Sequence, residues 1–306
     1  DATLSTEGQS VTFVYVDGTE GWKNIQDSTS NVTGASFICA SVSGSCNAIV
    51  TSGNFKTAVF KGPGNFTVNS VGACASDNVV DYIVVAGGGS GGSGRGGGGG
   101  GGGFRMFSSA PGSNDPKNHT AGITVTAQTY PIVVGGGGGA KPMGSAVVGA
   151  GGSNSSGLGI TSTGGGGGGT GPGGSGVAGT GGSGGGGNFY LVPTAGGAGN
   201  TPPVSPPQGS NGAAGGPASV PCAQRSAGAG GGAGATGGSQ PGGAGGAGGF
   251  IADPFIGPTA PSYGTGGPTS STRYFAGGGG AGMQCGSGGA ASPGGGGGAG
   301  GGTSPG

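Results

Sequence analysis

Short apolar runs separated by turn residues occupy the first 85 residues of the chain. The first run, Val11–Val16 (VTFVYV), ends at the turn pair Asp17-Gly18. Val, Phe, Tyr, Ile and Thr dominate these runs, and Gly, Asn, Asp or Pro separates them, which is typical of short strands joined by tight turns. The pattern predicts six or seven strands that form a small N-terminal β-sandwich or barrel, the head. The other predicted strands are Ala35–Ala40, Ala48–Thr51, Phe55–Phe60, Asn65–Val71 and Val79–Val85.

From residue 86 onward apolar residues become rare and glycine dominates with a period of three. Only nine of the 94 glycines lie before residue 86. In the segment 241–250 the residues other than glycine are Pro241, Ala244, Ala247 and Phe250, with glycine pairs between them. Three residues per turn is the repeat of the polyproline II helix. Glycine at the inward positions would let such helices approach until backbone N–H and C=O groups bond between them, so the spacing predicts a bundle of polyglycine II helices.

The alternative for residues 86–306 is a disordered linker, which composition alone favours. Two features favour order instead, because the glycine runs are short and regularly punctuated, and aromatic residues such as Phe104 and Phe250 lie at their edges. Ordering the backbone costs about 1–2 kcal/mol per residue. Only a dense network of hydrogen bonds, each contributing about 0.5–1.5 kcal/mol net, could offset that cost. We therefore expect a head domain over residues 1–85 and a glycine-rich polyglycine II bundle with interrupting loops over residues 86–306.

Composition excludes several other classes of protein. Only three residues are Leu and no apolar stretch has a helical period, so we expect almost no α-helix. Nine basic and nine acidic residues cancel, and no basic patch is evident, which argues against nucleic-acid binding. No run of about 18 apolar residues occurs, so we expect no membrane insertion. The chain starts at Asp1 without the pattern of a signal peptide, which is either absent or already removed.

The five cysteines indicate an oxidising setting outside the cell. None forms the C-x-x-C pair that is typical of zinc or thioredoxin-like sites. Cys39 and Cys46 flank six residues rich in Ser, which predicts a short hairpin closed by a disulfide. Cys74, Cys222 and Cys285 are left without an assigned partner. The expected localisation is therefore extracellular.

Motifs for catalysis, cofactors and metals are missing or incomplete. Gly87–Gly92 matches G-x-G-x-x-G after a predicted strand, but more glycine follows where a dinucleotide fold needs a helix. The only histidine is His119, and Asp115 and Asp253 are the only acidic residues beyond residue 85. A catalytic or metal site needs partners that this set does not provide. The sequence predicts a protein that is not an enzyme and has no cofactor or metal site.

Loops between the glycine runs are the candidate binding site. The longest interruption is Phe104–Val134, and exposed aromatic and polar groups on a rigid scaffold suit recognition of sugars or of surface proteins. The alternative is that Phe104, Phe107 and Tyr130 only pack on the bundle. The candidate receptor-binding residues are Phe104, Arg105, Met106, Phe107, Lys117, His119, Tyr130, Phe189, Tyr190, Phe255, Tyr263 and Tyr274.

Several motifs resemble a family of viral proteins. They include TEGQSVTFVYVDGTEGWKNIQDSTSNVTG (Thr6–Gly34), VDYIVVAGGGSGG (Val80–Gly92), ITVTAQTYPIVVGGGG (Ile123–Gly138) and GNTPPVSPPQG (Gly199–Gly209). With these motifs the chain resembles glycine-rich virion structural and tail-fibre proteins of bacteriophages, and its glycine-rich part is similar to the tip adhesins of T-even-like long tail fibres. The resemblance implies a layered polyglycine II sandwich in a virion, whose loops attach to a protein or glycan of the host surface. It also implies self-association as a fibre or trimer, or binding to other virion proteins.

A second hypothesis from a different class is a secreted subunit of an extracellular glycine-rich filament. Paired cysteines are unexpected in a protein assembled in a bacterial cytoplasm, and no long domain for anchoring to a virion is evident. A head-to-tail contact between copies gives an open fibre when the rotation does not close. A strand donated from Asp1–Ser10 could form that contact.

Overall fold

The fold is mostly β, in small sheets of two or three short strands, with almost no α-helix. The computed structural model describes residues 11–19, 22–27, 37–72, 74–110, 115–142, 146–171, 176–189, 193–217, 219–267, 271–295 and 297–298. The longest helical stretch among them joins α1 (Asp253–Ile256) to the 3₁₀ helix η4 (Gly257–Ser262). Both the predominance of strands and the scarcity of helix are therefore confirmed.

The strands of the head largely follow the apolar runs. β4 (Ala48–Ser52) and β5 (Phe55–Val59) pair as an antiparallel hairpin, and the ends of both lie within one residue of the predicted strands. β6 (Gly64–Ser70) and β3 (Cys39–Val42) also pair antiparallel. One further strand, β2 (Trp22–Asp27), was not predicted, because its polar sequence WKNIQD lacks an apolar run; it pairs with β1, Val11–Tyr15.

Residues after the first glycine runs complete the sheets of the head. β11 (Thr129–Ile132) adds a third strand beside β6. β10 (Ile123–Thr124) pairs with β7 (Val79–Val80), which Asp81 separates from β8, Tyr82–Val85. Because side chains alternate along a strand, Phe66 and Val68 of β6 face one side and pack on buried Val125, forming one hydrophobic cluster. The interruption Phe104–Val134 is therefore built into the head.

A second hydrophobic cluster lies where the head meets the glycine-rich part. Phe104 and Met106 of β9 (Phe104–Phe107), Ile251 of β14 (Gly249–Ala252) and Ile256 of α1 are at most 6% exposed and pack together. β9 pairs with β8, and β14 pairs with β16, Thr272–Phe275. The remaining strands here are β12 (Ser155–Gly157), β13 (Ile160–Ser162) and β15 (Thr265–Gly266).

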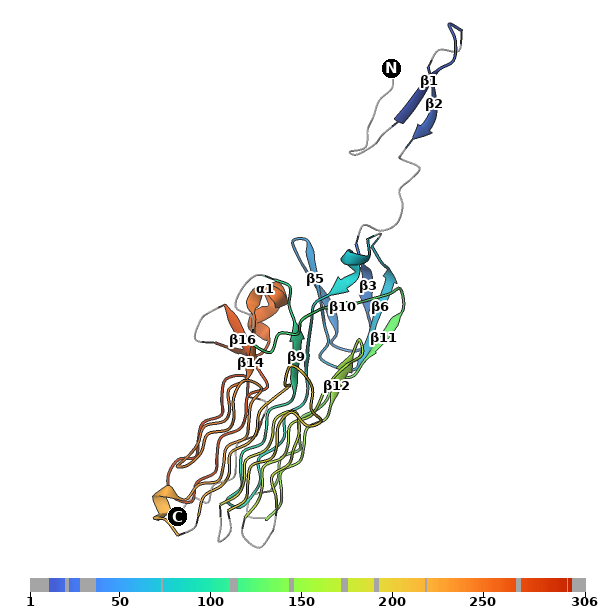
Figure 1. Ribbon diagram of the computed structural model, residues 1–306. Helices are drawn as coiled ribbons and strands as arrows, with labels where there is room; N and C mark the ends of the chain where they lie inside the picture. Colours follow the sequence, from blue (N-terminus) through green and yellow to red (C-terminus); the bar gives the residue numbers. More distant parts are fainter. Residues whose placement is uncertain are drawn as a thin grey trace.

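Extended glycine-rich segments run side by side away from these strands (Figure 1). We call them the glycine-rich array, and the end next to β8, β9, β12 and β14 its head end. At the opposite, distal end the chain turns back at residues 93–96, 219–225, 240–242 and 283–288. The segments of the array are residues 86–103, 134–142, 146–153, 163–171, 176–189, 193–199, 209–217, 226–248, 276–282 and 289–295.

Backbone hydrogen bonds join the segments of the array with a repeat of three residues. In the run 97–103 every third N–H, at residues 97, 100 and 103, donates to the segment 163–169. The N–H groups one position later, at residues 98 and 101, donate to the segment 226–248. The carbonyl groups of the same run accept bonds from further segments, so the run has neighbours on several sides. The bonds to the first segment are Gly97 N–Gly169 O (2.9 Å), Gly100 N–Gly166 O (2.8 Å) and Gly103 N–Thr163 O (2.7 Å), and those to the second are Gly98 N–Gly228 O (3.1 Å) and Gly101 N–Gly231 O (2.9 Å).

Close approach of these backbones leaves no room for a side chain in the central run. A Cβ built on Gly97 would lie 1.9 Å from the carbonyl oxygen of Gly186, and one on Gly99 would lie 2.1 Å from that of Gly89. Contacts this short with backbone atoms cannot be relieved by moving a side chain. The run Gly96–Gly103 is therefore glycine at every position because it is surrounded by main chain.

Segments at the surface of the array need glycine at only two positions of every three. Pro241, Ala244 and Ala247 are exposed, whereas the glycines of the stretch 243–249 are buried. The period of three that is visible in the sequence thus corresponds to one solvent-facing row of side chains and two rows of buried glycine.

Replacing Gly99 by Ala tests this constraint. We expect Gly99→Ala to destabilise the fold by about 2 kcal/mol or more, because overpacking costs about 1–3 kcal/mol even where side chains can adjust. Gly139→Ala is the matched control, because its Cβ would have nothing within 4 Å. A methyl group there should leave stability unchanged or raise it by up to about 1 kcal/mol. Thermal unfolding measures both, and equal stabilities of the two variants would contradict the prediction.

Candidate functional site

Five of the candidate receptor-binding residues gather around one narrow crevice at the head end. Phe104, Arg105, Met106, Lys117 and His119 line it together with Tyr82 and Pro206, but it has no free volume for a water molecule. The side chains of Phe104 and Met106 are only 1% exposed. Their assignment as receptor contacts is therefore wrong, because both side chains belong to the hydrophobic cluster that also contains Ile251 of β14.

The charged side chains of this crevice are bonded within the chain. Lys117 Nζ donates to the carbonyl oxygen of Pro207 at 3.1 Å, and Arg105 Nη1 donates to that of Thr161 at 3.5 Å. Burial lowers the pKa of Lys117, and the nearby Asp115 carboxylate offsets this only in part. These contacts fix β9 and the loop after it against neighbouring segments, and so they give both cations a structural role.

The other aromatic candidates at the head end are half-buried and pack on the clusters. The Tyr130 hydroxyl accepts a bond from Thr126 N at 2.8 Å, and its ring lies 6.4 Å from that of Phe66. Phe255 and Tyr263 pack against the cluster that contains Phe104. These three residues therefore stabilise the head end. Half-buried as well are Phe107, His119 and Tyr274.

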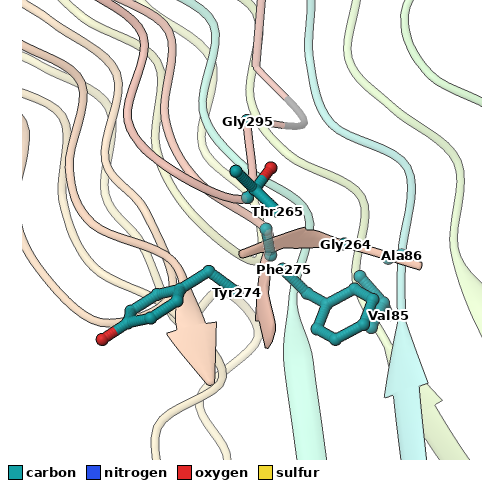
Figure 2. A pocket seen from close by; sticks show the side chains of 9 residues that line it. Val85, Ala86, Gly264, Thr265, Tyr274, Phe275 and Gly295 are labelled. Atoms are coloured by element: carbon teal, nitrogen blue, oxygen red, sulfur yellow. The ribbon is translucent and has the colours of Figure 1, made fainter. Parts of the chain in front are cut away.

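One cavity at the head end, of about 290 Å³, lies between β8, β15 and β16 (Figure 2). The rings of Tyr274 and Phe275 and the side chains of Val85 and Thr265 border it, together with backbone of glycine residues. Its volume is at the lower limit for small-molecule sites, which also need several converging polar groups. The lining offers two hydroxyl groups and no charged side chain. This cavity can hold an uncharged group at most.

The remaining candidates lie at the distal end. Phe189 is 1% exposed, so it too is a core residue and not a receptor contact. The guanidinium of Arg95 lies over its ring, 5.9 Å from the centroid. Tyr190 lies outside the described residues. The predicted receptor-binding residues therefore do not form one site. Most of them lie at the head end of the array, whereas Phe189 lies at the distal end.

The turns of the distal end are joined into one surface by polar contacts. Thr170 Oγ1 donates to Ser93 O at 2.8 Å, and Asn188 Nδ2 donates to Thr170 O. Asn188 N in turn donates to Thr194 Oγ1 at 2.8 Å. The row continues through Gly215 N–Thr194 O (3.0 Å), Gly216 N–Ser226 O (3.0 Å) and Gln284 N–Arg225 O (3.1 Å). The distal turns are therefore held in fixed positions relative to one another.

A disulfide closes part of this surface. Cys222 and Cys285 are bonded across 63 residues of sequence and join the turn at 219–225 to the turn at 283–288. Arg225 lies between the same two turns, where its Nε donates to Val220 O at 2.7 Å and its Nη1 to Gln284 Oε1 at 3.4 Å. The loop-to-loop contacts thus keep the polar side chains of the distal end in place.

The disulfide predicted between Cys39 and Cys46 is wrong. Both cysteines are free and exposed. Cys39 begins the extended strand β3, which ends at Val42. A strand advances about 3.3 Å per residue, so Cys39 is carried about 10 Å from the start of the turn that contains Cys46. A disulfide requires Cα atoms within about 7 Å.

The distal cysteines were not paired by sequence reasoning, because segments far apart in sequence meet there. Cys222 and Cys285 each lie within a polar interruption between glycine runs, but nothing in the sequence places these two interruptions at the same end of the array.

No family model, curated protein or solved structure matches this chain. Within the part of the chain that the structure describes, no group of three or more His, Cys, Asp or Glu side chains could hold a metal ion. No helix in the same residues is long and apolar enough to cross a membrane.

Replacing the cysteines in pairs tests the disulfide assignment. We expect Cys222→Ser/Cys285→Ser to lower the free energy of unfolding by about 2–4 kcal/mol, because the bond restricts the unfolded chain. Cys39→Ser/Cys46→Ser is the matched control and should have little effect. Denaturant unfolding gives both values, and intact mass after alkylation should show three reactive thiols before reduction and five afterwards. If the control variant Cys39→Ser/Cys46→Ser were the destabilised one, the disulfide would have to be assigned to Cys39 and Cys46 instead.

Proposed function

We propose that the protein is a non-enzymatic adhesin, of the kind found in bacteriophage tail fibres or virions, that displays loops for binding to a host-surface receptor. In this proposal the head is a small β-sandwich and the glycine-rich array is a bundle of polyglycine II helices. The observation that carries the proposal is the gathering of turns at one end of an array that is cross-linked by backbone hydrogen bonds.

The three-residue repeat of the hydrogen bonds supports the polyglycine II part of the proposal. A helix with three residues per turn presents every third residue to the same neighbour, and the run 97–103 bonds to its neighbours in that order. Ser90 and Ser93 keep the same spacing, and their hydroxyl groups accept bonds from Ala150 N (2.8 Å) and Val147 N (3.0 Å). A serine can therefore replace glycine in the array where its hydroxyl joins the network.

The contact surface in this proposal is the distal end. Side chains at the head end are engaged in the two hydrophobic clusters and in bonds such as Lys117 Nζ–Pro207 O. The distal turns carry exposed residues, among them Ser239, Gly286 and Ser287. Binding residues are commonly found on loops that a rigid scaffold positions. The disulfide between Cys222 and Cys285 supports a setting outside the cell.

A second candidate, the secreted filament subunit, is favoured by the β1–β2 hairpin. Tyr15 is 53% exposed and Trp22 is 68% exposed, although their rings contact each other at 5.4 Å. Phe13, Val14 and Val16 are also exposed. A two-stranded hairpin is marginally stable on its own, so these apolar side chains suit a contact with a neighbouring copy.

Introducing a tryptophan at one of two sites, in separate variants, tests where the contact surface lies. We expect Ser287→Trp, at the distal end, to lower saturable attachment of the purified protein to intact bacterial cells by tenfold or more, because the indole obstructs the contact. Ala247→Trp, on the exposed side of the array, adds the same side chain and should leave attachment unchanged. Flow cytometry over a panel of strains measures both. Attachment to no strain would contradict the adhesin, and loss only with Ala247→Trp would move the contact to the side.

Electron microscopy separates the two candidate functions. For the adhesin we expect discrete particles of uniform size in negative stain at micromolar concentration. Long fibres that disappear in the variant Tyr15→Ser/Trp22→Ser would favour the filament, because this variant removes exposed aromatic surface from the hairpin.

A further inference from the structure

The net charge of zero conceals a separation of charge along the array. Nine acidic and nine basic residues cancel over the whole chain, but no Asp or Glu occurs between residues 116 and 252 or after residue 253. Each carboxylate in the described residues lies in the head or at the head end. They are Asp17, Asp77, Asp81, Asp115, which accepts a bond from Phe250 N, and Asp253, which pairs with Arg273.

Three cations lie at the distal end. Arg95 occupies the turn at 93–96, Arg225 the turn at 219–225, and Lys141 the end of the segment 134–142. Gly138 N donates to Gly88 O, and Ser93 N to Val147 O, which places the end of Lys141's segment beside the turn of Arg95. Within the described residues the distal end therefore carries three positive charges and no carboxylate.

Both guanidinium groups are held by the fold. Arg95 lies over the ring of Phe189, and Arg225 uses two of the five N–H donors of its side chain to bond Val220 O and Gln284 Oε1. Each of the three cations is half-buried. A cation that is already fixed loses less conformational freedom when it binds an anion, so this arrangement favours binding over simple solvation.

We propose that the distal end binds an anionic polysaccharide of the cell envelope. The inference rests on the proposed adhesive function and names the chemistry of its receptor. Carboxylate, phosphate or sulfate groups on such a polymer accept charge-assisted hydrogen bonds from Arg and Lys, and the hydroxyl groups between them match the Ser, Thr, Asn and Gln residues of the distal turns. The absence of acidic side chains from these turns removes the repulsion that an anionic polymer would otherwise meet.

A polysaccharide fits this surface better than a nucleic acid. Duplex DNA carries one charge per about 1.7 Å of axis, and proteins that bind it commonly contact about 6–10 phosphates. Three cations spread among uncharged turns suit a polymer in which charges are sparse and hydroxyl groups are frequent.

Binding to dextran sulfate and to uncharged dextran of equal length tests the inference. We expect the full chain to bind immobilised dextran sulfate and to lose that binding as the salt concentration rises toward 1 M. It should not bind uncharged dextran. Arg95→Gln/Lys141→Gln should lower the affinity about tenfold or more, since each removes a charged hydrogen-bond donor. Lys56→Gln/Lys61→Gln in the head removes the same charge and should bind as the unaltered chain does. The conservative variant Arg95→Lys/Lys141→Arg should retain binding.

Other outcomes would overturn the inference. These are equal binding to both dextrans, an equal loss in the head variant, or tighter binding to duplex DNA than to dextran sulfate. Thermal unfolding of each variant verifies that the fold is intact, and because Arg225 supports the disulfide-linked turns it is left unchanged. If Arg95→Gln/Lys141→Gln attaches to cells normally while Ser287→Trp does not, the adhesive function stands and the anionic receptor is wrong.

Discussion

The structure depends on one constraint, which is that main chains lie close enough to bond to each other in several directions at once. Hydrogen bonds of 2.7–3.1 Å join the central run to its neighbours, and a Cβ on Gly97 or Gly99 would lie about 2 Å from a carbonyl oxygen. Glycine is therefore required by space in the array, and its usual entropic disadvantage is offset by a network that uses donors and acceptors on each side. Little apolar burial is needed, which explains how a chain with so few large aliphatic residues can fold.

The same constraint determines where other residues can occur. Surface segments accept a side chain at every third position, as at Pro241, Ala244 and Ala247, and polar side chains enter the interior where they join the network, as at Ser90 and Ser93. Within the described residues, charged and aromatic side chains lie in the head or at the two ends of the array. Because the head end is engaged with the strands and their hydrophobic clusters, the exposed residues of the distal turns, such as Ser239 and Ser287, can vary with little effect on folding. This is the physical basis of the proposed adhesive role.

Local patterns predicted much of the fold, and long-range contacts account for what was missed. The apolar runs located β4, β5 and β6 closely, and the repeat of three anticipated which glycines are buried. No local signal showed that β11 would complete the sheet of β6, or that Cys222 and Cys285 would meet. Phe104 and Phe189 were candidate receptor contacts, with packing on the bundle as the alternative for Phe104. Both are buried, because the ends of the array need apolar side chains to close them.

Amide hydrogen exchange followed by mass spectrometry tests the central claim most directly. If bonded main chains hold the array together, the amides of Gly97–Gly103 should exchange orders of magnitude more slowly than those of the surface segment 135–139, because an amide exchanges only when its hydrogen bond opens. Exchange within seconds throughout residues 86–298, with the head alone protected, would contradict the account.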